Sequence, residues 1–491
     1  MARLRQRSAL CEQFRHVFVA AGVTALVIAP CVVARADDSH YQDILVGGRA
    51  IGLGGAFTSI ADDPSGMYYN PAGLGDARST NLQVATSLYG FERGSIPQGL
   101  VAPVPGVDSL RLEFTDLIII PASAGFVSTF GPLDDEQRPV QAYGLSVVVP
   151  SYRSFTAGAG SSSPSDPVQP GVLRSYQRRV TDRELWAGAG VGRRMTPDLR
   201  IGISAYYILR SMTDREDLTV SDHVDLAATA TSPATSFDRF QTVTDDISLI
   251  NGAVVLIAGA RYTPTPHVAL GASLYAPSIP IHSQVTLNFS RATADPGATS
   301  GQPSTLENLS IRGESGQKYA PAVRLGVSYA QTYKYTLSFD VSYHAPVSYS
   351  LIRPRANEVA DYQSFKSRLP FDPDIHRRAV VNFNAGAEFL IVREVSIAGG
   401  IFSDFSSAES IPANPSGDQA AQVDLFGLAM AIGYFGSHTL SRLGVMYSFG
   451  TGHDVIPQSD VERLTQGQQA FRRVPYFQSF FYVFLSNTFR Y

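Results

Sequence analysis

The chain has 491 residues, a formal net charge of −4 and 44% hydrophobic residues. A mildly acidic chain is a poor candidate for binding nucleic acid. After the N-terminus no apolar run is long enough for a transmembrane helix, so a membrane location would require a β-barrel.

The N-terminus has the pattern of a secretory signal peptide. Four arginines in the first 15 residues precede an apolar run from Val17 to Val33, and Ala34-Arg35-Ala36 offers small residues for cleavage. We therefore expect residues 1–36 to be removed, leaving Asp37 first. A membrane anchor is the alternative, but the run is short for a spanning helix and Pro30 interrupts it.

Cleavage would also change the chemistry of the remaining chain. Both cysteines, Cys11 and Cys31, would be lost, and a lipoprotein anchor at Cys31 is disfavoured because Pro30 stands where a small residue is needed. Five of the 39 basic residues and one of the 43 acidic residues would go, leaving 34 against 42 and a net charge of −8. A large closed barrel does not need disulfides.

The segment that follows is rich in glycine and apolar residues. Residues 47–74 contain too much glycine for a membrane strand and are too apolar for a solvated tail. Because the segment precedes a long series of alternating strands, we expect residues 37–80 to fold as a plug, or hatch, inside a barrel formed by residues 81–491.

Within this segment, Asn70-Pro71-Ala72 fits a helix start, with Asn as the cap and Pro at the first helical position. Residues 47–74 resemble the hatch of the FadL/TodX family of outer-membrane transporters, in which an Asn-Pro-Ala triplet marks the hatch. The resemblance implies uptake of long-chain fatty acids or other hydrophobic compounds, such as aromatic hydrocarbons. It also implies a location in the outer membrane of a Gram-negative bacterium.

Two other motifs in this region have ordinary explanations. Gly52-Leu53-Gly54-Gly55 lacks the βαβ surroundings of a nucleotide site. Asp62 and Asp63 offer carboxylates for Ca²⁺, but such runs more often form a turn or begin a helix. We expect no metal and no cofactor.

From Asn81 onward, apolar and polar residues alternate with the period of a strand that faces lipid on one side and a lumen on the other. In residues 199–207, for example, Ile201 and Ile203 fall on one face, and Ser204 and Tyr206 fall on the other. The pattern predicts an all-β fold, a 14-stranded antiparallel transmembrane β-barrel. The expected strands are 81–91, 114–131, 140–155, 176–194, 199–213, 244–262, 267–279, 319–331, 335–349, 379–391, 395–406, 422–436, 440–451 and 476–491.

The lengths of the connections support this count. Short and long gaps alternate, as expected when turns face the periplasm and loops face outside. An even number of strands puts both ends on the periplasmic side. Residues 281–290 also alternate, but a strand there would break this rhythm, so we expect a loop.

The predicted lumen face carries glycines near the short-turn ends of the strands. Glycine inside a strand costs stability unless another backbone approaches closely, so their shared level suggests that the plug packs there; relief of crowding in a curved sheet is the alternative. They are Gly125, Gly144, Gly192, Gly202, Gly259, Gly271, Gly326, Gly386, Gly400, Gly433 and Gly444. Polar residues on this face could anchor the plug or line a hydrated lumen; they are Asp182, Glu184, Arg200, Arg324, Asp340, Glu388 and Arg442.

The resemblance implies that substrate leaves sideways where one strand kinks. The third predicted strand contains Gly144 and Pro150, and proline cannot donate to a ladder, so this strand is the candidate for the gap; Pro121 in the second strand is another. Ligand contacts are expected from Leu53, Phe57 and Ile60 and from inward residues such as Val148, Val255 and Ile257.

The remaining features concern partners and alternative functions. The last strand ends in an aromatic residue, Tyr491, and resembles the signal read by the barrel-insertion machinery. Outer-membrane lipid and lipopolysaccharide are expected surroundings. The histidines show no metal-ligand spacing and no Gly-x-Ser-x-Gly elbow is present, so no enzyme is predicted. A plugged barrel that docks partner proteins without transport is the alternative function, and a lumen without an apolar cavity would favour it.

Overall fold

A computed structural model describes most of the chain from Ser39 to Tyr491. The described residues are 39–77, 80–100, 110–134, 139–163, 172–226, 235–294, 304–366, 372–415, 417, 419–457 and 471–491. The expected signal peptide, residues 1–36, lies outside them. No helix in this described part is long and apolar enough to cross a membrane.

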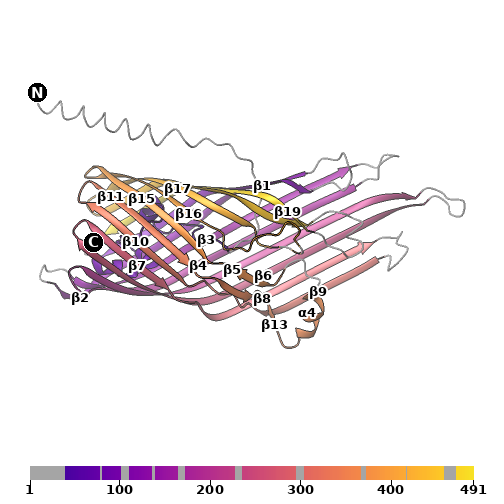
Figure 1. Cartoon of the computed structure of the whole chain (residues 1–491), viewed down its shortest axis with the longest axis horizontal. Helices are drawn as coiled ribbons and strands as arrows, with labels where there is room; N and C mark the ends of the chain where they lie inside the picture. Colours follow the sequence, from indigo (N-terminus) through magenta and orange to yellow (C-terminus); the bar gives the residue numbers. More distant parts are fainter. Residues whose placement is uncertain are drawn as a thin grey trace, which may run out of the picture. The chain divides into compact units, whose positions relative to one another are not determined.

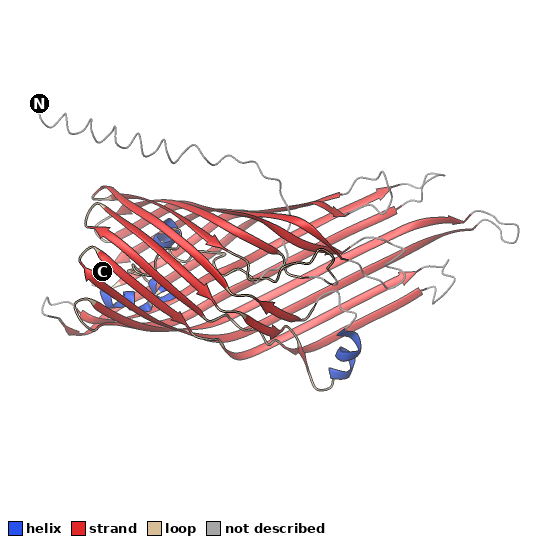
Figure 2. Ribbon diagram, viewed as in Figure 1, coloured by secondary structure: helices blue, strands red, loops and turns tan. Residues whose placement is uncertain are grey.

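Fourteen antiparallel strands of the described chain form one closed ring (Figures 1 and 2). The first strand pairs with the last, from Asn81 opposite Arg490 to Ser95 opposite Phe477, which closes the barrel. The prediction of a 14-stranded barrel is confirmed. In ring order the strands are β1 (Asn81–Leu100), β2 (Leu110–Leu133), β3 (Pro139–Ser163), β4 (Val172–Arg194), β5 (Leu199–Leu226), β6 (Thr235–Thr265), β7 (Val268–Tyr275), β10 (Ala322–Gln331), β11 (Tyr335–His344), β15 (Val380–Val392), β16 (Val395–Asp404), β17 (Gln422–Phe435), β18 (Thr439–Pro457) and β19 (Phe471–Arg490).

The alternation along each strand sorts its side chains between the two faces of the wall. On β5, Ile201 and Ile203 are 42% and 49% exposed and point outward, whereas Ser204 and Tyr206 are buried inside. The outward face therefore presents apolar side chains to lipid, and the inward face packs against the contents of the barrel.

The strands differ greatly in length around the ring. β5 and β6 have 28 and 31 residues, whereas β7 has 8 and β10 and β11 have 10 each. β1 to β6 extend well beyond their predicted ends because paired strands continue past the lipid-facing zone. In that extension Arg215, Glu216 and Asp217 still pair with β6.

The prediction of a loop at residues 281–290 was wrong. This stretch belongs to β8 (Ile279–Ala294), which pairs with β9 (Ser304–Glu314) in a hairpin. β6 is long enough to pair with β7 through residues 257–265 and with β8 through residues 240–254. The hairpin therefore adds strands without entering the ring, and the even count is preserved.

Short elements follow β11 on the side of the long connections. β12 (Val347–Ser350) pairs with β14 (Asp374–Arg377), and β13 (Arg353–Pro354) pairs with β9. The helix α4 (Val359–Lys366) lies near β9 and β13 in Figure 1. Its residue Tyr362 is buried in a cluster with Met212 and Leu249.

Candidate functional site

Residues 39–77, here called the N-terminal segment, lie against the inward faces of strands around most of the ring. They contain the short helices α2 (Gly48–Gly52) and α3 (Gly66–Tyr69) and the 3₁₀-helix η1 (Pro71–Asp76), which appear behind the front strands in Figure 2. Its backbone and side chains bond to β3, β6, β11, β15 and β16. Most of its apolar residues are completely buried.

Asn70 joins three parts of this packing. Its Oδ1 accepts a hydrogen bond from the Ala72 backbone N–H at 3.1 Å, which caps η1 before Pro71. Its Nδ2 donates to the carbonyl oxygen of Thr58 at 2.8 Å and to that of Ala260 in β6 at 3.0 Å. Asn70 is completely buried, so it is both a helix cap and a tie between the segment and the wall.

We expect Asn70→Ala to weaken docking of the segment by about 2–4 kcal/mol, because it leaves buried carbonyl oxygens and an N–H without partners. The readout is trypsin cleavage after Arg49, the one Lys or Arg within residues 39–77. Cleavage should accelerate about 30-fold or more. Asn288→Ala, at an exposed asparagine of the β8–β9 hairpin, is the control, and equal cleavage of the two variants would contradict the role of Asn70.

The predicted ring of glycines meets the segment at nine of its eleven positions. A side chain on Gly202 or Gly259 would run into Pro71 and Ala72, and one on Gly386 or Gly400 would run into Leu53. A side chain on Gly125, Gly144, Gly192, Gly271 or Gly326 would also run into atoms of the segment. Gly433 and Gly444 are corrections: a side chain on either would meet barrel residues first, such as Ser396 and Phe484, although the segment packs nearby through Gly52 on Ala431.

Charged groups fasten the segment at several points on the wall. Glu388 of β15 is buried and accepts from Nε of Arg49 at 2.8 Å and from Nη2 of Arg442 at 3.1 Å. Asp340 of β11 accepts from the backbone N–H groups of Phe57 and Thr58 at 2.8 and 2.7 Å. Arg200 also pairs with Asp76 of the segment at 2.7 Å, and Arg324 lies over Tyr68 and Tyr69. With Glu388 and Asp340, four of the seven predicted polar residues therefore contact the segment directly.

An inner cavity of about 90 Å³ lies where the segment faces β3, β4, β7 and β10. Its lining is strongly aromatic: Tyr68 of the segment makes edge contacts with Trp186 at 5.6 Å and with Tyr275 at 6.1 Å between ring centroids. Tyr319 lies 5.9 Å from Trp186. The other aromatic lining residues are Tyr41 and Tyr349. Such walls suit flat, apolar ligand groups.

Arg324 of β10 brings a buried positive charge to this cavity. Its guanidinium carbon lies 5.3, 5.4 and 5.1 Å from the ring centroids of Tyr68, Tyr69 and Tyr275. Burial raises the pKa values of Tyr68 and Tyr69, although the nearby Arg324 acts in the opposite direction, so these rings stay neutral. Tyr phenolates therefore do not neutralise Arg324.

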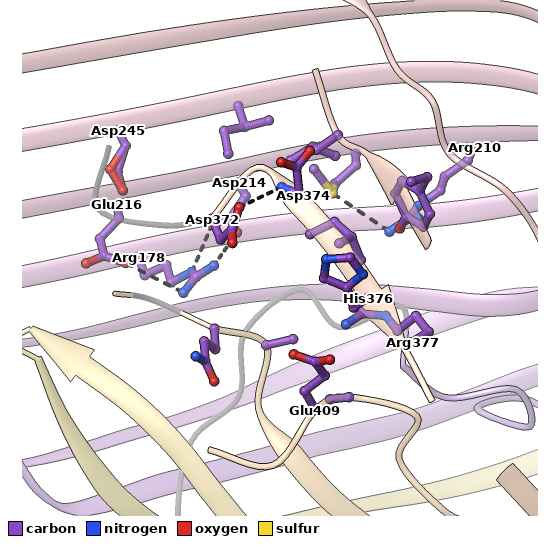
Figure 3. A pocket seen from close by; sticks show the side chains of 18 residues that line it. Arg178, Arg210, Asp214, Glu216, Asp245, Asp372, Asp374, His376, Arg377 and Glu409 are labelled. Carbon is purple, nitrogen blue, oxygen red and sulfur yellow. Dashed lines mark hydrogen bonds and ion pairs between the residues drawn. The ribbon is translucent and has the colours of Figure 1, made fainter. Parts of the chain in front are cut away.

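A second, outer cavity of about 200 Å³ lies further toward the long connections and shares Arg210, Tyr349 and Arg377 with the inner one. β14, residues 408–409 and residues 419–420 form one side of it, and β4, β5 and β6 form the other (Figure 3). Its lining is charged, with Arg178 paired to Asp214 at 2.8 Å. The outer cavity is therefore charged, whereas the inner cavity is aromatic.

The main-chain ladder between β2 and β3 is incomplete. It ends at the pair Ser123–Val148, and the described residues above it, 110–122 and 149–163, form no ladder with each other. β3 also bulges against β4 between Val148 and Ser151, so Pro150 is unpaired on that side. We call this boundary the seam.

Side chains bridge the seam, and the N-terminal segment bonds to its β3 side. The rings of Phe114 and Phe155 stack across it with centroids 4.5 Å apart. The Pro150 carbonyl accepts from the backbone N–H of Ile44 at 3.1 Å. Asp43 accepts from Ser151 Oγ at 2.8 Å. Pro150 and Ser151 also line the inner cavity, so the seam and the cavity are neighbours.

The other predicted site residues lie away from these openings. Leu53, Phe57 and Ile60 are buried in one apolar cluster with Val148, Val255 and Ile257 and line neither cavity; ligand contact by them remains a prediction. Gly144 pairs with both neighbouring strands and packs against Met67, so it marks no gap. Pro121 lies at an irregularity between β1 and β2.

Several residues that build the site could not be identified from the sequence. Asn384 of β15 donates to Gln42 at 2.8 Å and to the Gly54 carbonyl at 2.7 Å. His40, Asp43 and Asp404 could hold a metal by type, since their ligand atoms lie within 4.8 Å of one another. Arg153 lies 3.3 Å from Asp43, and His40 lies 3.4 Å from Asp404, so ion pairing accounts for this group without a metal.

A closed barrel with an apolar outer face and a segment inside it defines an outer-membrane β-barrel of a Gram-negative bacterium. No family model matches the sequence, and no curated protein is detectably similar to it.

The fold is that of the FadL and TodX proteins. The chain superposes on a FadL homologue of Pseudomonas aeruginosa with a TM-score of 0.52 at 15% identity, covering 92% of this chain and 99% of the other. For the toluene transporter TodX of Pseudomonas putida the TM-score is 0.52 at 12% identity, with the same coverage. A deletion mutant of TodX, described as a monoaromatic hydrocarbon channel, gives 0.54 at 13% identity with the same coverage.

Proposed function

We propose that this protein is a channel that takes up hydrophobic small molecules across the outer membrane by passive diffusion, with the N-terminal segment as a hatch. The observation that carries the proposal is the aromatic inner cavity beside the unpaired seam at Pro150. The structural neighbours named for toluene transport, hydrocarbon passage and FadL homology support the same class of solute.

The route follows from the order of the openings. A solute enters the outer cavity from outside and passes Arg210 and Tyr349 into the inner cavity. It then leaves through the seam into the membrane when Asp43 and Ile44 release Ser151 and Pro150. In the described part of the chain this boundary lacks a main-chain ladder and is held by side-chain contacts, apolar packing and the bonds of Asp43 and Ile44 to β3, so we take it as the weakest part of the wall that touches the cavity.

The docking-barrel alternative has less support. It would be favoured by a lumen without an apolar cavity, whereas the inner cavity carries six aromatic side chains. The catalytic alternative has no structural support among the neighbours, which are named as transporters and channels.

Uptake of labelled toluene and of a labelled long-chain fatty acid tests the proposal. Cells that express the protein should take up at least one of them faster than cells that lack it. If neither is taken up faster, transport of these classes is refuted and the docking role becomes the better explanation.

Pro150→Val should reduce this uptake while the barrel stays assembled. Valine supplies the N–H that proline lacks, which favours regular pairing of β3 with its neighbours at this point and so narrows the seam. Pro475→Val, at an exposed position of β19 away from the seam, is the matched control and should leave uptake unchanged. Heat-modifiable migration on gels checks assembly of both variants, and normal uptake by an assembled Pro150→Val barrel would rule out an exit at this point.

A further inference from the structure

Three features of the inner cavity point to a ligand with a negative charge as well as an apolar body. Four basic side chains line it, against the two acidic side chains of Asp182 and Glu184. Both acids face Arg210, whose nitrogens lie 2.6 Å from Asp182 and 3.9 Å from Glu184. The acids are therefore already engaged, and the lining has a net positive charge.

Arg324 is the part of this charge that has no carboxylate in direct contact, although Asp340 on the next strand attracts it from a distance. It is 6% exposed, and its Nε has no hydrogen-bond partner. Among the described residues no ion pair to its guanidinium is found. The carboxylate on the next strand, Asp340, uses Oδ2 to accept from two backbone N–H groups of the segment. A buried guanidinium without a carboxylate is costly unless a ligand supplies one.

The other walls limit the shape of that ligand. Tyr68 and Tyr319 each meet Trp186 edge to face, with interplanar angles of 73° and 78°, which suits the face and edge of an aromatic ring better than a flexible alkyl chain. The cavity volume of about 90 Å³ is small, which favours a single ring over a long chain. Lys318, also in the lining, is exposed and adds a second cation at the margin.

We infer that the inner cavity binds a small aromatic carboxylate, with Arg324 as the main contact for the carboxylate and Lys318 as a second. The ring lies against Trp186 and Tyr68, and the carboxylate forms charge-assisted hydrogen bonds to the guanidinium. This inference rests on the proposed function and narrows its solutes to those that combine a ring with an anionic group.

Trp186 is the single tryptophan of the chain, so its fluorescence reports directly on the cavity. The test is a fluorescence titration of the purified full-length protein in detergent at neutral pH. The probes are benzoate, its neutral counterpart benzamide, toluene and hexanoate. Benzoate should change the signal saturably, with an affinity about tenfold or more above those of benzamide and hexanoate.

Variants of the two basic residues then show which side chain binds the carboxylate of benzoate. Arg324→Gln should weaken benzoate binding about tenfold or more and should weaken toluene binding much less. Lys318→Gln, at an exposed position, should weaken benzoate less and keep the fold. Lys334→Gln, at an exposed lysine in the turn between β10 and β11, is the matched control and should have no effect. Trypsin resistance at Arg49 verifies that the segment stays docked in each variant.

The outcomes separate the two proposals. Equal affinity for benzoate and benzamide, or an unchanged benzoate affinity in a docked Arg324→Gln variant, overturns the anion site. Hexanoate binding as tightly as benzoate overturns its preference for a ring. If toluene binds and is taken up in either case, the channel function stands without the anion site. If no probe is bound and none is taken up, both proposals fail.

Discussion

Glu388→Ala is expected to release the N-terminal segment from the wall. Glu388 is buried between the guanidinium groups of Arg49 and Arg442, and Ser396 donates to it at 3.0 Å. Removing the carboxylate leaves Arg442 facing Arg49 without the anion that both share, although Asp62 still pairs with Arg49. Breaking a buried pair in this way costs about 3–5 kcal/mol, which is the largest single effect we expect at the interface between the segment and the barrel.

Trypsin cleavage after Arg49 measures this release, and single-channel conductance shows whether the lumen opens. Both should rise strongly in Glu388→Ala and less in Glu388→Gln, which keeps an acceptor but loses the charge. Glu394→Ala removes an exposed carboxylate from the turn after β15 and should behave as wild type. A Glu388→Ala protein that stays protease-resistant and closed would show that the ion pairs do not hold the segment.

Gly400→Ala is expected to weaken docking of the segment by overpacking, and its sequence neighbour provides the control. A Cβ on Gly400 would lie 2.2 Å from the Gly54 nitrogen and 2.3 Å from the Leu53 carbonyl carbon. Gly54 has φ +61°, so the facing turn of the segment cannot easily rearrange to make room. Overpacking of this kind costs about 1–3 kcal/mol, here at the expense of docking.

Gly399→Ala adds the same methyl group on the lipid side, where the nearest atom within reach is the Ala429 carbonyl oxygen at 3.8 Å. The two variants have the same composition and differ only in the face that carries the methyl group. Faster cleavage after Arg49 in Gly400→Ala alone confirms close packing of the segment, and equal behaviour of the pair contradicts it. Thermal stability of the barrel should be similar in both.

The strands of the ring could be predicted because alternation is a local property of the sequence. Each of the fourteen predicted ranges overlaps one ring strand. Their outer ends could not be predicted, because above the membrane a strand such as β5 carries Arg215 and Asp217 and has no lipid-facing apolar row. The β8–β9 hairpin was missed for a related reason: its partner is the far half of β6, and pairing between distant segments leaves no local signal.

The candidate site was predictable only in part. The glycines on the inward face indicated a close approach, and most of them meet the segment. The sequence could not show that Arg324 lies among tyrosines from the segment and from β7, or that Asn384 bonds to Gly54. These contacts join residues that are far apart in the chain, and no spacing rule relates them. Pro150 was identifiable because proline interrupts a ladder wherever it occurs.

The contacts of the segment also determine when it can dock during assembly. Ser39 bonds to Ser406, 367 positions later, and Arg49 bonds to Glu388, 339 positions later. The part of the chain made first therefore has no complete binding surface until β16 exists. Contacts of such long sequence separation form slowly. During this interval the apolar segment needs a chaperone or the unfinished barrel to shield it from aggregation.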